Sequence, residues 1–393
     1  MLGEHELTWD RLIARSPEEH ERRGIDVRLQ TEVTAIDVDR REVQWRDLAS
    51  GREGIEGFDR LVYATGAGAR RPAIEGLEHG CFLYSPEQAK ALGERLPAVR
   101  RAVVAGGGYI GLEMAEALRR RGAETVLVTR APQVMRPLDP DIAAHVEAAL
   151  VSEGVEVRTN TELLAIEQRG DGYAAITSAG EIVTDMVVIG LGSVPNAELA
   201  EAAGIALGET GAVAVNHAQR TNIEGIYAAG DCAESWHRVM ERWVNYHLGT
   251  IANKAGRVAG LNVCGREASF PGVVGTAITR ICGAEVARTG LSEREAALIG
   301  MEVKGRVVET STRAGYMEDA GTMWTKLIVE ASSGRVVGGQ IVGDAGSGKR
   351  IDTVATAVTA GMTVQDIVDL DLSYAPPFSP VWDPVQTAGR VLL

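Results

Sequence analysis

The stretch Arg101-Ala-Val-Val-Ala-Gly106-Gly-Gly108-Tyr-Ile-Gly111 decides the fold of this chain. It has the pattern of a buried strand, a glycine turn and the first turn of a helix, the context in which such a turn binds a dinucleotide. Gly106 permits the tight turn, Gly108 lets backbone amides approach a pyrophosphate, and Gly111 lets the helix pack closely on the strand. Because a helix N-terminus carries partial positive charge, we expect a nucleotide site here.

The residues around this turn predict a complete βαβ unit. Apolar periodicity favours alternating strands and helices, followed by a strand pair that ends near residue 182 and by a closing strand. The predicted elements are strand 101–105, helix 109–121, strand 124–129, helix 140–153, strand 155–159 and strand 186–190.

The end of strand 124–129 discriminates between NAD and NADP. An acid there would bind the ribose 2′-hydroxyl, but position 129 is Thr129, and Arg130 and Arg136 follow. Two guanidinium groups can hold a 2′-phosphate, and no acid repels it. The alternative is that both arginines are ordinary solvated side chains. We expect NADPH to be preferred over NADH.

A second feature is an internal repeat. Gly24-Ile-Asp-Val-Arg28 reappears 130 residues later as Gly154-Val-Glu-Val-Arg158, and Asp59–Gly66 corresponds to the segment 184–192. Two copies of one supersecondary unit imply two similar half-folds. A counterpart of Gly106 displaced by the same 130 residues would precede Met1. We therefore expect an α/β fold with two Rossmann-like units, the first N-terminally incomplete.

The chain is expected to return to its first unit near residue 216, with a strand at 226–229 and a helix at 249–263. From about 269 the pattern becomes one of recurrent strands and capped helices, typical of an α+β domain. The predicted domains are 1–97 with 214–268 as the first dinucleotide-binding unit, 98–213 as the second, and 269–393 as a C-terminal interface domain.

Composition limits the functional classes. The chain has 393 residues, and its net charge of −14 argues against nucleic acid, which needs a basic footprint. No apolar run approaches the ~18 residues of a membrane helix. The first residues, Met-Leu-Gly-Glu-His-Glu, have neither a basic region nor an apolar core, so the expectation is a cytoplasmic protein without a signal peptide.

Four cysteines occupy positions 81, 232, 264 and 282. They form no C-x-x-C pair and have no metal-like spacing. We interpret them as buried or half-buried thiols, Cys232 included, and expect no metal site.

Taken in order, four motifs resemble the pyridine nucleotide–disulfide oxidoreductases, two-dinucleotide flavoproteins with a duplicated Rossmann-type unit. The motifs are Tyr63-Ala-Thr-Gly-Ala67, Gly106-Gly-Gly-Tyr-Ile-Gly-Leu-Glu113, Gly190-Leu-Gly-Ser-Val-Pro-Asn196 and Ile226-Tyr-Ala-Ala-Gly-Asp231. Near the C-terminus, Ser373–Asp383, Lys349–Asp352 and Ala314–Tyr316 are similar to the coenzyme A-disulfide reductase and NADH oxidase branch. That branch implies a homodimer formed through 269–393.

The resemblance implies roles for individual residues. Asp231 would accept hydrogen bonds from the ribityl chain of FAD, with Gly230 allowing close approach, and the first turn of helix 249–263 would face the flavin pyrimidine. Tyr374, and less directly Tyr316, would reach across the dimer as proton donors. Tyr109 would cover the isoalloxazine until nicotinamide displaces it, and Glu113 would help orient the nicotinamide. The remaining implied cofactor contacts are Thr65 and Gly66 for the adenosine diphosphate of FAD, Leu248, Gly249 and Thr250 for the flavin, and Ile110 and Gly192.

The chain also departs from the family pattern. The glycine turn for FAD and the redox-active cysteine would lie upstream of Met1, and none of the four cysteines occupies that position. A truncated chain or a misplaced start codon is the expected explanation. The predicted activity is hydride transfer from NADPH, or NADH, to FAD and on to a disulfide such as coenzyme A disulfide. Two alternatives stay open: an NAD(P)H oxidase, peroxidase or polysulfide reductase of the same branch, and a non-catalytic dimeric NADP-binding remnant.

Overall fold

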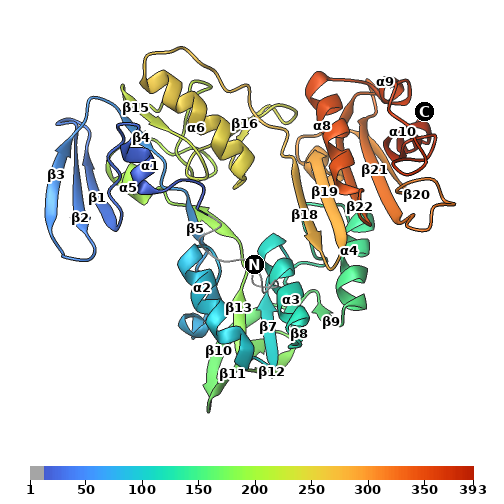
Figure 1. Cartoon of the computed structure of the whole chain (residues 1–393), viewed down its shortest axis with the longest axis horizontal. Coiled ribbons are helices and arrows are strands. Elements are labelled where there is room, and N and C mark those ends of the chain that lie inside the picture. The colour runs from blue at the N-terminus through green and yellow to red at the C-terminus, as the bar shows by residue number, and fades with distance from the viewer. Residues whose placement is uncertain (1–12) are drawn as a thin grey trace.

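The computed structural model describes residues 13–393, which form three bodies (Figure 1). We call them the first unit, the second unit and the C-terminal domain. In Figure 1 the second unit lies at the bottom, with the first unit above it and the C-terminal domain to the right. The predicted α/β class, with Rossmann-like units and a separate C-terminal α+β domain, is confirmed.

The second unit is built on a five-stranded parallel sheet of order β6-β13-β7-β8-β9. Val103 and Val104 in its central strand are fully buried, because helices or a smaller sheet cover both faces, as parallel sheets require. The elements are β6 (Cys81–Phe82), α2 (Pro86–Arg95), β7 (Arg101–Ala105), α3 (Tyr109–Arg120), β8 (Glu124–Val128), α4 (Pro140–Ser152), β9 (Val155–Arg158) and β13 (Met186–Ile189).

The internal repeat is visible as two three-stranded antiparallel sheets, one in each unit. Each sheet has a register shift in its first strand pair, at Thr34 in one and at Leu164 in the other, which are 130 residues apart. A β-bulge is a specific local device rather than a defect, so its recurrence at the repeat distance supports the duplication. The strands are β1 (Thr31–Asp37), β2 (Glu42–Asp47), β3 (Glu53–Gly57), β10 (Leu163–Arg169), β11 (Gly172–Thr177) and β12 (Gly180–Thr184).

In the first unit, two parallel strands from distant parts of the chain lie side by side, β4 (Leu61–Tyr63) and β15 (Ile226–Ala228). The segment 24–29, which contains the first copy of the repeated Gly24–Arg28 sequence, forms no strand, although the second copy contributes β9, and Ile25 and Leu29 are 50% and 64% exposed. The physical reason is that no described strand pairs with this segment. The remaining elements are α1 (Pro17–Glu21), β5 (Ala67–Ala69), β14 (Ser193–Pro195), α5 (Glu198–Ala202), β16 (Ser235–His237), β17 (Arg242–Val244) and α6 (Gly249–Val263).

The observed boundaries between the units differ from the predicted ones at 97 and 213. β6 pairs with β13, so the second unit already begins at Cys81. Ala197 and Val213 pack in one core cluster with Tyr63 and Ile226, so the chain has returned to the first unit by residue 197. A two-residue strand such as β6 carries no periodicity, and the sequence pattern could not reveal it.

The C-terminal domain is an antiparallel sheet of order β18-β19-β22-β21-β20, with α8 packed on its face. Only the two-residue turn Cys282-Gly283 separates β19 from β18. The elements are β18 (Ala277–Ile281), β19 (Ala284–Gly290), α7 (Glu293–Leu298), β20 (Val303–Ser311), β21 (Thr322–Glu330), β22 (Val336–Gly343), α8 (Ile351–Ala360), α9 (Val364–Val368) and α10 (Pro384–Arg390). Within residues 13–393 no helix is both long and apolar enough to cross a bilayer.

Candidate active-site cleft

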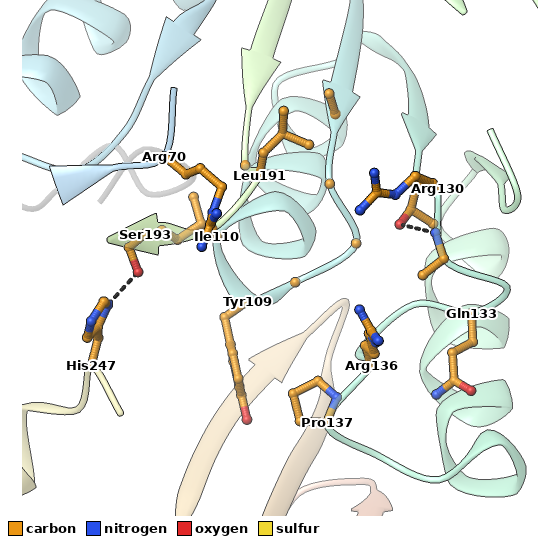
Figure 2. Close-up of a pocket in the computed structure, with 18 of the residues that line it drawn as sticks. Arg70, Tyr109, Ile110, Arg130, Gln133, Arg136, Pro137, Leu191, Ser193 and His247 are labelled. Carbon is orange, nitrogen blue, oxygen red and sulfur yellow. Dashed lines mark hydrogen bonds between the residues drawn. The ribbon is translucent and has the colours of Figure 1, made fainter. Parts of the chain in front are cut away.

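One cleft of about 1790 Å³ lies where the two units and the C-terminal domain meet. The first unit contributes Asp231 and Leu248, and the C-terminal domain contributes Arg288. The second unit contributes most of the walls, through the glycine turn, the loop after β8 and the loop after β13 (Figure 2). Of the predicted cofactor residues, the cleft is lined by Gly106, Gly108, Tyr109, Ile110, Glu113, Thr129, Arg130, Arg136, Gly192, Asp231 and Leu248.

The geometry of the glycine turn fits a pyrophosphate. Gly106 has φ +118°, and a Cβ there would lie 2.1 Å from the carbonyl oxygen of Gly190. A Cβ on Gly111 would lie 1.9 Å from the carbonyl oxygen of Gly106, so the close packing of α3 on the turn requires glycine. At Gly108, the N-cap of α3, a Cβ would meet nothing within 4 Å, and no side chain caps the helix. The first amides of α3 are therefore open to an anion in the cleft.

The two predicted phosphate-binding arginines differ in their surroundings. Nη1 of Arg130 lies 3.2 Å from Oε1 of Glu162, and both side chains are substantially exposed. Arg136 is exposed, and among residues 13–393 its guanidinium has no ion-pair or hydrogen-bond partner. Thr129, at the end of β8, is buried. Figure 2 shows both arginines on the side of the cleft next to the glycine turn.

Tyr109 and Glu113, both on α3, face the C-terminal domain. Figure 2 shows the ring of Tyr109 extending from the N-terminus of α3 toward strands of that domain. Burial raises the pKa of the Tyr109 phenol above its ordinary value of 10.0. The Oγ1 of Thr279, on β18, donates a hydrogen bond of 2.6 Å to Oε1 of Glu113. This end of the cleft is thus closed by the C-terminal domain.

The flavin end of the predicted site is formed by the first unit. Gly230 has φ +86°, and a Cβ there would lie 3.7 Å from Cβ of Ala252 in α6. Nδ2 of Asn245 donates to the main-chain oxygen of Asp231 over 2.9 Å, which fixes the loop that carries this carboxylate. Leu248 is the N-cap of α6, and no side chain caps that helix. An acceptor for ribityl hydroxyls and a positive helix end therefore meet the same cleft.

A polar chain in this cleft was missed by the sequence analysis. Nδ1 of His247 lies 2.5 Å from Oγ of Ser193, and its Nε2 lies 2.6 Å from Oδ1 of Asn245. Burial lowers the pKa of His247, against the attraction of Asp231. All four residues line the cleft. The available signal in the sequence was that His247 directly precedes Leu248 and Ser193 directly follows Gly192.

Several predicted residues lie outside the cleft walls. Thr65 donates to the main-chain oxygen of Asn196 over 2.7 Å, and Gly66 has φ +69°. Gly249 and Thr250 lie in the first turn of α6. Tyr316 and Tyr374 are 76% and 49% exposed on the C-terminal domain and do not line the cleft within one chain. Their predicted place in a partner's site stays a prediction.

None of the cysteines, all four of which are described, lines the cleft. Cys81 and Cys232 are buried, which raises the pKa of each thiol. Burial likewise raises the pKa of Cys282, to about 12. The expectation of buried or half-buried thiols is wrong for Cys264, which is exposed because it is the C-cap that ends α6 at the surface. A nucleophilic thiol requires a lowered pKa, so Cys81, Cys232 and Cys282 lack that character.

The described residues fit the ring and ribityl end of FAD, through Asp231, Leu248 and the open N-terminus of α6. For the adenosine diphosphate end the fit is partial. Thr65 and Gly66 stand at the end of β4, and no strand–glycine turn–helix like 101–111 accompanies them within residues 13–393.

A duplicated dinucleotide-binding unit joined to an antiparallel interface domain, with one cleft among them, defines a class of two-nucleotide oxidoreductases. The comparisons agree. The family model described as pyridine nucleotide-disulphide oxidoreductase matches residues 5–248, and its dimerisation domain matches residues 276–384. The chain belongs to the pyridine nucleotide-disulphide oxidoreductase family, as its motifs predicted.

Several of the similar proteins fall in the predicted branch. The NAD(P)H coenzyme A polysulfide/persulfide reductase of Pyrococcus horikoshii is 39% identical over 98% of this chain and 86% of its own length. The coenzyme A disulfide reductase of Staphylococcus aureus is 27% identical, with 96% and 86% covered. Among solved structures, a NAD-dependent persulfide reductase from A. fulgidus has a TM-score of 0.94 at 38% identity, covering 100% of this chain and 74% of that one.

Proposed function

We propose that this chain is a flavin-dependent oxidoreductase that takes two electrons from NADPH and passes them through FAD to a sulfur–sulfur bond of the coenzyme A disulfide or persulfide class. The main support is the continuity of the cleft, because Gly108 at one end and Asp231 at the other line a single cavity. Hydride passes only between groups held in contact. Bound FAD would supply the two-electron redox chemistry, while the protein supplies binding and orientation.

The second unit would bind the nicotinamide nucleotide. The open amides at the start of α3 suit its pyrophosphate, and Gly108 leaves room for it. Arg136 and Arg130 suit the 2′-phosphate of NADPH, and Thr129 puts no negative charge beside it. Tyr109 would exclude water from the hydride-transfer position until the nicotinamide takes its place.

The first unit would hold the flavin. Asp231 would accept hydrogen bonds from the ribityl hydroxyls, and the positive end of α6 would stabilise negative charge on the pyrimidine edge. Ser193, which follows the loop after β13, and His247, which precedes α6, lie 2.5 Å apart and would sit between the two cofactor positions. This contact would keep the nicotinamide end and the flavin end in register.

The choice of a sulfur–sulfur bond as the electron acceptor is supported by the similar proteins, which include a coenzyme A polysulfide/persulfide reductase and a coenzyme A disulfide reductase. The overall reaction is NADPH + H⁺ + RSSR′ → NADP⁺ + RSH + R′SH, in which the sulfur–sulfur bond is reduced and the nicotinamide oxidised. In a homodimer formed through the C-terminal domain, Tyr374 and Tyr316 of one protomer would supply protons to the leaving thiolate in its partner. Their exposure in the single chain is compatible with that role.

The test is an anaerobic titration of the purified, FAD-loaded protein with NADPH, followed by absorbance. Bleaching of the flavin, and its recovery on addition of coenzyme A disulfide or polysulfide, would support the proposal. Recovery only with oxygen would replace the acceptor with that of an oxidase. A protein that binds NADPH and takes up no flavin would be a non-catalytic NADP-binding protein, and the proposal would be wrong.

A further inference from the structure

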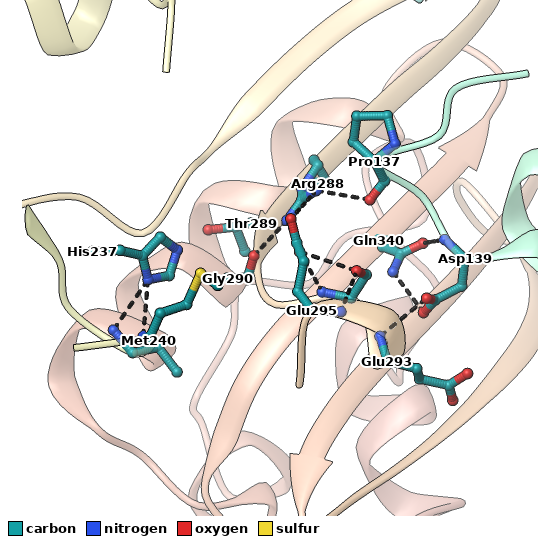
Figure 3. A network of polar contacts seen from close by, with 12 residues as sticks. Pro137, Asp139, His237, Met240, Arg288, Thr289, Gly290, Glu293, Glu295 and Gln340 are labelled. Carbon is teal, nitrogen blue, oxygen red and sulfur yellow. Dashed lines mark hydrogen bonds and ion pairs between the residues drawn. The ribbon is translucent and has the colours of Figure 1, made fainter. Parts of the chain in front are cut away.

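The C-terminal domain holds the short segment that carries Arg136. Nη1 of Arg288, on β19, donates to the main-chain oxygen of Pro137 over 2.7 Å. Oε1 of Gln340, on β22, accepts from the main-chain amide of Asp139, and its Nε2 donates to the Asp139 carboxylate, both over 2.8 Å. Figure 3 shows the loop entering the network from the second unit and meeting these side chains. Pro137 and Asp139, which follow Arg136, are therefore both hydrogen-bonded to the C-terminal domain.

Arg288 is itself fixed. It is 6% exposed, and its Nη2 lies 2.6 Å from both Oε2 of Glu295 and the main-chain oxygen of Gly290. A buried guanidinium with a carboxylate and two carbonyl acceptors has no freedom to move. The position of the Pro137 carbonyl is therefore set by the C-terminal domain.

Asp139 is a second point at which this segment is held. Its Oδ1 accepts from the main-chain amide of Glu293 over 3.0 Å, and its Oδ2 lies 3.2 Å from Nζ of Lys326. Lys326 is 1% exposed and also contacts Asp141 and Glu293. The carboxylate of Asp139 thus receives donors from three elements of the C-terminal domain, and removing any one leaves buried charge less well compensated.

On the N-terminal side of Arg136, the preceding residue Met135 is hydrogen-bonded to the glycine turn. The amide of Met135 donates to the main-chain oxygen of Gly107 over 2.7 Å, and Met135 has φ +46°. The amide of Leu138 then donates to the oxygen of Met135 over 2.8 Å. The Cα of Arg136 is therefore held between the glycine turn and the C-terminal domain, while its guanidinium has no hydrogen-bond or ion-pair partner among residues 13–393.

We infer that the C-terminal domain determines the preference for NADPH, through Arg288 and Gln340 acting as positioning residues for Arg136. The inference depends on the proposed binding of the NADPH 2′-phosphate by Arg136. Neither residue need touch the phosphate. If the network only joined two domains, its loss would weaken NADPH and NADH binding equally, whereas displacement of Arg136 weakens NADPH alone.

The experiment measures the dissociation constants of NADPH and NADH for the full chain by calorimetry. The variants are Arg288→Lys, Gln340→Met and Arg136→Ala. A charge-assisted hydrogen bond to phosphate contributes enough that its misplacement should weaken NADPH binding about tenfold, with NADH changed by less than about twofold. When Arg288→Lys or Gln340→Met is combined with Arg136→Ala, NADPH binding should weaken no further relative to NADH binding. The reason is that both positioning residues act through the guanidinium of Arg136.

Arg350→Lys is the matched control. Arg350 also pairs with a carboxylate, that of Asp383 at 2.9 Å, and donates to the main-chain oxygen of Thr312. It lies in the same domain and contacts nothing in 136–139 among its described hydrogen bonds. This variant should reduce thermal stability and leave the ratio of the two dissociation constants unchanged.

Equal losses for NADPH and NADH in Arg288→Lys and Gln340→Met, or selective losses additive with Arg136→Ala, would overturn the inference alone. If Arg136→Ala does not change the dissociation constant of NADPH, the proposed phosphate site is refuted, and the inference with it. The two failures are therefore distinguishable.

Discussion

Glu162 should compete with the 2′-phosphate of NADPH for the guanidinium of Arg130. Its carboxylate lies 3.2 Å from Nη1 of Arg130, and the two side chains are 47% and 78% exposed. A bound phosphate would have to take Arg130 from this partner and tolerate the remaining negative charge. We predict that Glu162→Gln strengthens NADPH binding and leaves NADH binding unchanged.

The magnitude follows from the exposure of the pair. An exposed ion pair contributes up to about 1 kcal/mol, which corresponds to about a fivefold tighter dissociation constant for NADPH when Glu162 no longer competes. Because the Debye length is about 10 Å at 0.1 M salt and shorter above it, the gain should shrink as salt is added. The assay is calorimetric titration of both nucleotides at low and high ionic strength.

Glu156→Gln is the control for this prediction. It makes the same change in net charge in the same unit, where Glu156 pairs with Arg158 at 2.7 Å and lies outside the cleft walls. It should leave both dissociation constants unchanged. If Glu162→Gln strengthens NADH as much as NADPH, or weakens NADPH, the assignment of Arg130 to the 2′-phosphate is wrong.

The remaining predictions concern stability, the glycine turn and cofactor choice. Burial lowers the pKa of His237 from 6.5 to about 4. Because the unfolded chain then binds this proton more readily than the folded chain, the free energy of unfolding should fall by up to about 3 kcal/mol as pH is lowered from above 6.5 to 4. Urea unfolding should show a larger loss of stability over this pH range in wild type than in His237→Gln, because the variant keeps the contributions of other groups such as His247 and loses only that of His237. Gly106→Ala should destabilise the protein by more than about 1 kcal/mol because of its positive φ and close contact, whereas Gly108→Ala, with open space around it, should keep the wild-type melting temperature and weaken nucleotide binding. Thr129→Glu with Arg130→Met should move the ratio of kcat/KM toward NADH by roughly tenfold, and an unchanged ratio would contradict the NADPH assignment.

Local pattern predicted the second unit and one helix of the first unit well. Helix 249–263 was placed with the bounds that α6 has, and the strands around the glycine turn were placed to within a residue or so. These elements have strong periodicity and clear end signals. The individual roles of Gly106 and Gly111 also followed from sequence, because a turn that needs positive φ or close backbone contact leaves few other residues possible.

What the sequence could not provide was contact between distant residues. Arg288 and Pro137 are 151 positions apart, and nothing in either segment marks the other as its partner. The same holds for Ser193 and His247, 54 positions apart. The unit boundaries were misplaced for this reason too, since the core around Tyr63 and Ala197 is defined by packing and not by a local signal.

The central claim is that the nicotinamide and flavin positions share one cleft across which hydride passes directly. The most direct measurement is the rate of anaerobic flavin bleaching by NADPH, compared with NADPH deuterated at the transferred position, in the FAD-loaded protein. The account predicts slower bleaching with the deuterated nucleotide. Equal rates, or a flavin that NADPH does not bleach, would contradict it.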